Sequence, residues 1–217
     1  MSPRMAAQIS DAVVVDVLRR VDRLATPLAA RLGRPPELPQ TERDAWWAHR
    51  VSRVAAGVSA VPRFAGKLAD LLPLQNTVGT AVQSVVVLGV AGEHGVTGSA
   101  ERVSLLARVL LDRNLPPSEV APLLVKSRGT YRGEAFGAAE ERKGARGAVR
   151  TIWRVARLLS RIDEALDARP KGKLRHRLLS NIPVVGVAGG YAAEREGLRR
   201  AAARTAAVLA EGLSAPA

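Results

Sequence analysis

Residues 71–92 read LLPLQNTVGTAVQSVVVLGVAG, a run of 22 residues without a formal charge. The run is long enough to cross a bilayer, because a transmembrane helix needs about 20 predominantly apolar residues. Its Gln, Asn, Thr and Ser side chains make it too polar for that purpose. The apolar residues recur instead at helical spacing and gather on one side: they are Val78, Ala81, Val82, Val85 and Leu88. The stretch therefore predicts a core helix rather than a membrane span.

The composition around this stretch favours helices along the whole chain. Of the 217 residues, 47% are hydrophobic, which is enough to form a sizeable core. Aromatic residues make up only 3% of the chain, whereas Ala, Val and Leu dominate. Small and straight-chain apolar side chains suit closely packed helices better than sheets. The predicted fold class is all-α, a compact multi-helix bundle of about eight long and short helices.

Proline and glycine residues divide the chain into its expected parts. We expect an N-terminal helix in residues 1–34, a Pro-rich connector at 35–40 and a helical domain over 41–217. The candidate caps of the first two helices are Asp11 and Thr41. Further helices are expected between Pro62 and Pro73, from a cap at Thr97 or Ser99 to Asn114, in the LPPSEVAPLL stretch, over Ala148–Ala168, and towards the C-terminus up to about Gly212.

Positive charge is concentrated in one quarter of the chain. The formal net charge is +13, and residues 126–177 alone contain 15 basic and 6 acidic side chains, a net +9. The segments before and after this block have net charges of only +3 and +1. Such a block implies an anionic partner more strongly than a uniformly basic surface would.

The clearest amphipathic pattern lies in this block, in the stretch RTIWRVARLLSRIDEAL at residues 150–166. At 100° per residue, four arginines fall within about 60° of one another: Arg150, Arg154, Arg157 and Arg161. The opposite side is apolar and carries Ile152, Val155, Leu159, Ile162 and Leu166. Trp153 lies near the border, where an amphipathic ring suits a headgroup interface. Four more basic residues follow in the next turn, namely Lys171, Lys173, Arg175 and Arg177.

Three interpretations of these basic residues compete. They form the solvated outer face of a bundle helix, or a contact with anionic lipid, or a contact with nucleic-acid phosphate. Nucleic acid has little support, because there are few aromatic residues to stack bases and no recognised RNA-binding, zinc or helix-turn-helix pattern. Lipid is the preferred functional interpretation, because the basic block borders the two least polar segments of the chain.

The sequence contains no pattern that predicts catalysis, a metal site or a cofactor. There is no cysteine, which excludes thiol chemistry and zinc sites built on Cys. The histidines His49, His94 and His176 lack the spacing of a ligand cluster, and no G-x-S-x-G elbow is present. The N-terminal sequence also lacks the continuous apolar region of a signal peptide, so we expect a cytoplasmic location.

A glycine-rich stretch near the C-terminus, NIPVVGVAGGYAAERE at residues 181–196, has neither the lysine of a Walker loop nor the spacing of a dinucleotide-binding loop. Its glycines are better explained as positions where a helix starts pressed against a neighbour. Gly186, Gly189 and Gly190 are therefore predicted packing residues.

Two of these segments together resemble the EcsC family. VQSVVVLGVAGEHGV, residues 82–96, is similar to the family's helix in which Gln83 opens an apolar run that ends in a glycine turn. NIPVVGVAGGYAAE is similar to the family's closing Pro-Val-x-Gly segment with Gly186, and the resemblance covers roughly residues 50–210. It implies a helical, membrane-associated protein related to one encoded beside an ABC transporter, with Gln83 and Gly186 as packing positions and no catalytic residues to carry over.

From these observations we expect a non-catalytic protein that associates peripherally with the inner face of a membrane, or with a membrane-protein complex. The contact residues would be the four arginines of the amphipathic helix and the four basic residues that follow it. The alternative is a nucleic-acid-associated protein that uses the same arginines. No cofactor is expected.

Overall fold

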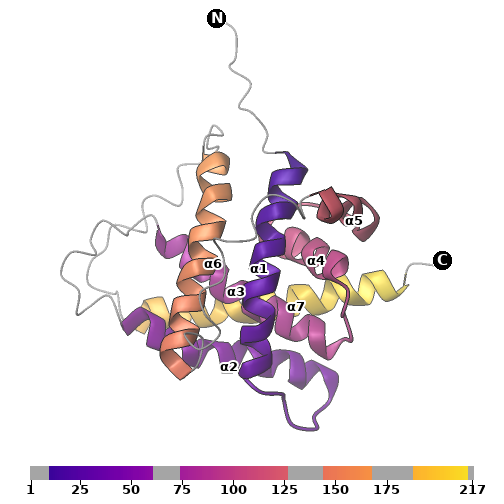
Figure 1. Cartoon of the computed structure of the whole chain (residues 1–217). Coiled ribbons are helices and arrows are strands. Elements are labelled where there is room, and N and C mark those ends of the chain that lie inside the picture. The colour runs from indigo at the N-terminus through magenta and orange to yellow at the C-terminus, as the bar shows by residue number, and fades with distance from the viewer. Residues whose placement is uncertain (1–9, 61–73, 127–143, 168–187, 215–217) are drawn as a thin grey trace, which may run out of the picture.

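The computed structural model describes residues 10–60, 74–126, 144–167 and 188–214. Every regular element in these ranges is a helix, which confirms the all-α class (Figure 1). The helices are α1 (Asp11–Arg31), α2 (Gln40–Ala60), α3 (Leu74–Glu93), α4 (Ser99–Leu111), α5 (Pro117–Lys126), α6 (Gly144–Asp167) and α7 (Ala188–Ser214). The short helix expected between Pro62 and Pro73 lies outside the described residues.

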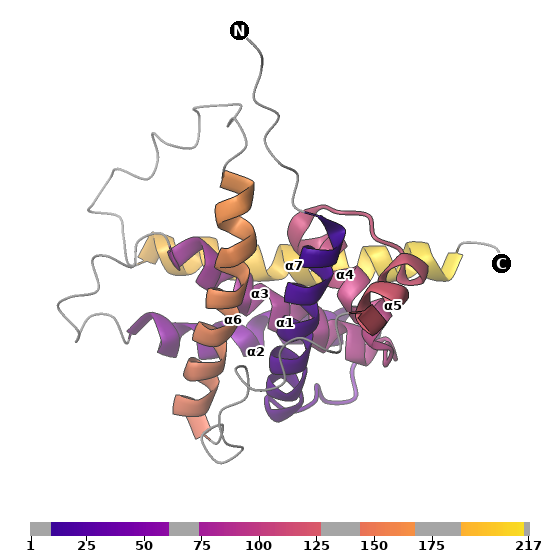
Figure 2. The same ribbon diagram turned by 45° about the horizontal axis from the view of Figure 1, so that its top comes forward.

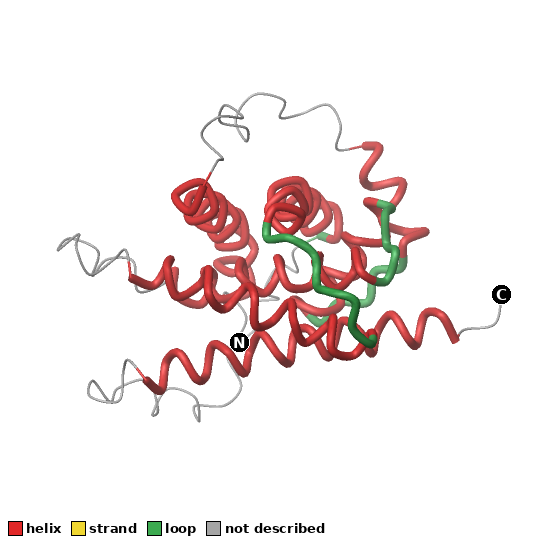
Figure 3. Tube along the Cα trace, turned by 90° about the horizontal axis from the view of Figure 1, so that it is seen from below, coloured by secondary structure: helices red, strands yellow, loops and turns green. Residues whose placement is uncertain are grey.

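Helix α3 occupies the centre of the bundle and packs against α1, α2, α4, α6 and α7. Helices α1 and α6 lie side by side and cross α3 on one side (Figure 2). Seen from below, these two helices are nearly end-on, and α7 lies on the opposite side of α3 (Figure 3). The arrangement leaves α3 covered on several sides at once.

This central position explains why the α3 sequence has no charge before its last residue. The consecutive residues Val85, Val86 and Val87 point in three different directions from the helix axis, yet each is at most 1% exposed. A helix that is apolar all round is a buried helix. The expected core helix is confirmed, but it is buried around its circumference rather than on one side only. Among the described residues, no helix combines the length and the apolar character needed to cross a membrane.

Helix α1 belongs to the same bundle as the helices after the connector. Its buried residues recur at helical spacing, as Val14, Leu18, Val21 and Ala25 do, and α1 packs against α3, α4, α5 and α6. The helix begins one residue after Ser10, so Asp11 lies in its first turn rather than at the cap.

The other expected caps are also shifted. Helix α2 begins at Gln40, so Thr41 lies inside the helix, and the Pro39 carbonyl accepts the backbone N–H groups of Glu42 and Arg43. Helix α4 begins at Ser99 with Gly98 as its N-cap, and no side chain caps it. It ends before Asn114, at Leu111, because Asp112 adopts the left-handed conformation with φ 54°.

Helices α2 and α3 approach each other closely where Trp47 lies directly against Gly89. A Cβ atom added at Gly89 would lie 2.3–2.8 Å from three carbons of the Trp47 ring. Trp47 is 3% exposed, and its neighbour Trp46 is half-buried and meets it edge-on at 5.1 Å between ring centroids. Only glycine at residue 89 allows the indole ring to reach the α3 backbone.

Candidate anionic-surface contact on helix α6

Helix α6 has two faces of opposite character. Its apolar residues Ile152, Val155, Leu159 and Ile162 are each at most 3% exposed, and the helix packs against α1 and α3. Burying four such side chains stabilises the docked helix by several kcal/mol, at roughly 1.5–3 kcal/mol for each. The orientation of α6 is therefore fixed by its apolar face.

The arginine edge of α6 faces away from this core. Arg150, Arg157 and Arg161 are exposed, and Arg154 is half-buried. Among the described residues, the guanidinium groups of Arg157 and Arg161 have no hydrogen-bond or ion-pair partner. Trp153 is half-buried at the margin and packs against the core. The structure thus brings the four predicted arginines to one edge of a helix that the core holds in place.

The other predicted site residues are distributed differently. Lys171, Lys173, Arg175 and Arg177 lie outside the described residues, as does Gly186. Gly189 and Gly190 belong to the first turn of α7. Gln83 lies at the contact between α3 and α7, where its Nε2 atom would be 3.3 Å from a Cβ added at Gly197.

A buried carboxylate that the sequence did not reveal joins α1 to α4. Asp22 is 2% exposed, and both of its oxygens accept hydrogen bonds from Arg102, at 2.7 Å from Nε and 3.1 Å from Nη2. Thr26 and Ser99 donate to the same carboxylate at 2.8 and 3.3 Å. The hydrogen bonds that Arg102 itself donates to Asp22 raise the pKa of Arg102 above its ordinary value. With four donors, the carboxylate is a structural anchor rather than a free reactive group.

A second polar contact fixes the start of α2 to the end of α3. The Nε2 atom of His94 lies 3.2 and 3.1 Å from the two oxygens of Asp44, to which Gln40 also donates. The adjacent Glu93 lies 3.8 Å from Arg43. Asp44, near the start of α2, thus engages a histidine that lies 50 residues away in the sequence.

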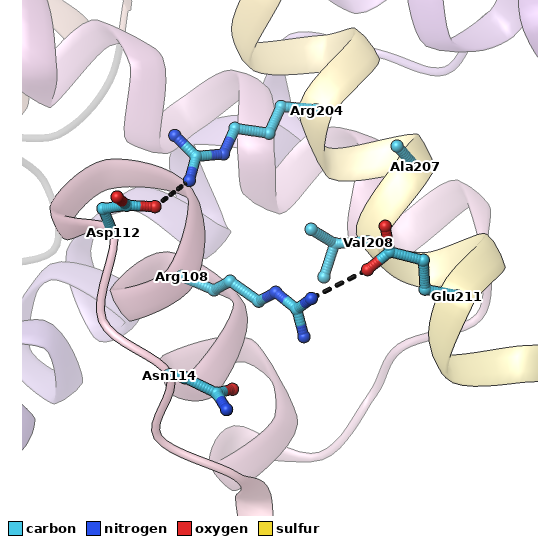
Figure 4. A pocket seen from close by; sticks show the side chains of 7 residues that line it. All are labelled: Arg108, Asp112, Asn114, Arg204, Ala207, Val208 and Glu211. Atoms are coloured by element: carbon cyan, nitrogen blue, oxygen red, sulfur yellow. Dashed lines mark hydrogen bonds and ion pairs between the residues drawn. The ribbon is translucent and has the colours of Figure 1, made fainter. Parts of the chain in front are cut away.

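A notch of about 390 Å³ lies between α4 and α7 (Figure 4). Two ion pairs cross it, Arg108 with Glu211 at 2.7 Å and Arg204 with Asp112. Each guanidinium is thus already matched by a carboxylate, so an anionic ligand would have to displace Asp112 or Glu211. The notch is better understood as a contact between two helices than as a ligand site.

Because this contact is open to water, it should contribute little to stability. The Arg108 and Glu211 side chains are 43% and 63% exposed, and exposed pairs contribute about 0–1 kcal/mol. The substitution Glu211→Gln is expected to change the free energy of unfolding by less than about 0.5 kcal/mol. Urea denaturation followed by circular dichroism checks this value; a loss several times larger would show that the pair holds α7 in place.

In the part of the chain that the structure describes, no group of three or more His, Asp or Glu side chains is arranged to hold a metal ion. The chain matches no protein-family model, no curated protein and no solved structure.

Proposed function

We propose that this protein is a non-catalytic helical protein that associates peripherally with an anionic membrane surface through the arginine edge of α6. The proposal includes the relationship to the EcsC family that the Gln83 helix and the closing glycine segment imply. The observation that carries it is the two-faced character of α6, whose apolar side is buried while Arg150, Arg157 and Arg161 are exposed on the other side.

Rigidity and charge both support this use of the helix. An amphipathic helix that inserts its own apolar face into lipid cannot also bury that face in a protein core. Because α6 buries its apolar face against α1 and α3, its contact with a membrane would be electrostatic, made by guanidinium groups with headgroup phosphates. Each basic residue near an anionic surface contributes on the order of 1 kcal/mol.

The test is co-sedimentation with liposomes of phosphatidylcholine alone and of phosphatidylcholine with phosphatidylserine, at low and moderate salt. The triple variant Arg150→Gln, Arg157→Gln and Arg161→Gln removes three charges and leaves the half-buried Arg154 in place. We expect its affinity for anionic vesicles to fall on the order of 100-fold, because about 3 kcal/mol of attraction is lost. Its circular dichroism spectrum and unfolding midpoint should stay unchanged.

A matched control removes the same charge elsewhere. Arg23 on α1, Arg34 between α1 and α2, and Lys126 at the end of α5 are exposed, and replacing all three with Gln should reduce binding much less. Equal losses in the two triple variants would mean that net charge, and not α6, governs binding. A different result would be that the wild-type protein does not bind anionic vesicles but binds duplex DNA with a steep salt dependence. That result would contradict the proposal and support nucleic-acid association instead.

A further inference from the structure

A second basic cluster lies away from α6, where α2 and α7 pack along each other. The imidazole of His49 on α2 lies between two guanidinium groups. Nη2 of Arg53 is 3.0 Å from its Nε2 atom, and Nη2 of Arg195 on α7 is 3.5 Å from its Nδ1 atom. Three side chains that can be cationic thus converge from two helices.

This arrangement contains more hydrogen-bond donors than acceptors. A guanidinium only donates, and a neutral imidazole accepts at just one of its two nitrogens. In either tautomer, therefore, one of the two arginines faces an N–H group instead of a lone pair. Neither Arg53 nor Arg195 contacts a carboxylate among the described side chains. An anion placed between the two guanidinium groups would supply the missing acceptors.

The neighbouring Arg50, on the same helix, has interaction partners within the protein. Its Nε atom donates to the Leu32 carbonyl at 2.9 Å, and its guanidinium lies over the Trp46 ring, 5.8 Å from the centroid. Arg50 is thus occupied in closing the end of α1. Arg53, one turn further along the same helix, has only His49 as a described partner.

The backbone on both sides of the cluster is held by packing. Trp47 lies against Gly89, which fixes α2 two residues before His49. Gln83 lies against Gly197, which fixes α7 two residues after Arg195. The two guanidinium groups are therefore carried by helices whose separation is set by the core, so less order has to be gained when a ligand binds.

We propose that Arg53 and Arg195 bind a phosphate group in the seam between α2 and α7, with a nitrogen of His49 as a third donor. Forked guanidinium groups match the oxygens of a phosphate, which makes inorganic phosphate or a phosphomonoester the class of ligand. The phosphate belongs to a soluble molecule or to a lipid headgroup. This site does not depend on the arginine edge of α6.

Arginine side-chain NMR tests the proposal with inorganic phosphate at constant ionic strength. The Nε–Hε resonances of Arg53 and Arg195 should shift and reach saturation, while that of the exposed Arg23 stays still. In Arg53→Gln, and separately in Arg195→Gln, the phosphate concentration for half-saturation should rise about 10-fold, because a charge-assisted hydrogen bond is lost. The backbone amide spectrum of each variant verifies that the fold is intact, and Arg23→Gln is the matched control.

Three results would overturn the proposal: resonance shifts that never saturate with phosphate, shifts of equal size at Arg23, or unchanged phosphate binding in both the Arg53→Gln and the Arg195→Gln variants. The source of the phosphate is assigned with vesicles of equal charge that carry either phosphatidic acid, a monoester, or phosphatidylglycerol, a diester. A preference for phosphatidic acid that disappears in Arg53→Gln identifies a lipid headgroup. Saturable binding of inorganic phosphate without that preference identifies a soluble phosphate. The α6 triple variant should keep phosphate binding, so failure of one site is distinguishable from failure of the other.

Discussion

Replacing Asp22 with Ala is expected to lower the free energy of unfolding by about 3 kcal/mol. The substitution leaves the Arg102 guanidinium at a helix contact without its carboxylate and removes the acceptor for Thr26 and Ser99. Breaking a buried ion pair by removing one partner costs about 3–5 kcal/mol. The lower value applies because the Arg102 side chain is 18% exposed and can partly recover its hydration. Urea denaturation of the two proteins under the same conditions measures the difference.

A double-mutant cycle separates the ion pair from the rest of the contact. Asp22→Leu and Arg102→Leu should each be strongly destabilising, because each leaves one charge unmatched. The variant with both substitutions should be more stable than the sum of the two single effects predicts, since no unpaired charge remains. Strictly additive effects would show that Asp22 acts through Thr26 and Ser99 rather than through Arg102.

Substituting Gly89 with Ala should destabilise the protein by about 3 kcal/mol, near the upper end of the cost of overpacking a core. The new methyl group would lie 2.3–2.8 Å from three ring carbons of Trp47, so the ring or the helix has to move. Trp47 is 3% exposed, so a shift of its ring would disturb the contact of α2 with α3. Thermal and urea unfolding measure the loss, with Gly92→Ala as the control because a Cβ there meets nothing within 4 Å.

A smaller side chain at residue 47 should relieve the steric conflict that the Gly89→Ala substitution creates. In a Trp47→Leu background, which is itself destabilised by a cavity, adding Gly89→Ala should cost much less than it does in the wild-type chain. The same cost in both backgrounds would contradict steric conflict with the indole as the cause. It would point instead to the α3 backbone at residue 89.

The amphipathic pattern of α6 shows what local spacing can predict. In this helix, arginines recur on one side and apolar residues on the other. Because a helix turns by a constant angle per residue, this spacing predicts which side is buried. The arginines are Arg150, Arg154, Arg157 and Arg161. The three-dimensional structure has Ile152 and Leu159 buried and Arg157 and Arg161 exposed, as that spacing requires. The uncharged α3 was likewise recognisable as a core helix, although burial around its whole circumference required neighbours on several sides.

Helix caps were predicted less well, because several groups near a helix start compete for the same backbone donors. Thr41 had the right chemistry for an N-cap, but the Pro39 carbonyl accepts the first N–H groups and α2 begins one residue earlier. Ser99 turned out to donate its hydroxyl to Asp22 on another helix. Neither competitor was evident from the local sequence.

By itself, the sequence determined the all-α class, the core role of the uncharged stretch at residues 71–92 and the two faces of α6. The first follows from composition and helical spacing, and the other two follow from periodicities within a single helix. Only the tertiary structure decided which charges meet. Asp22 lies 80 residues from Arg102, and His49 lies 146 residues from Arg195. Such pairs depend on which helices lie side by side and on their rotation about their axes. Both are set by the packing of the whole core, as the contact of Trp47 with Gly89 illustrates.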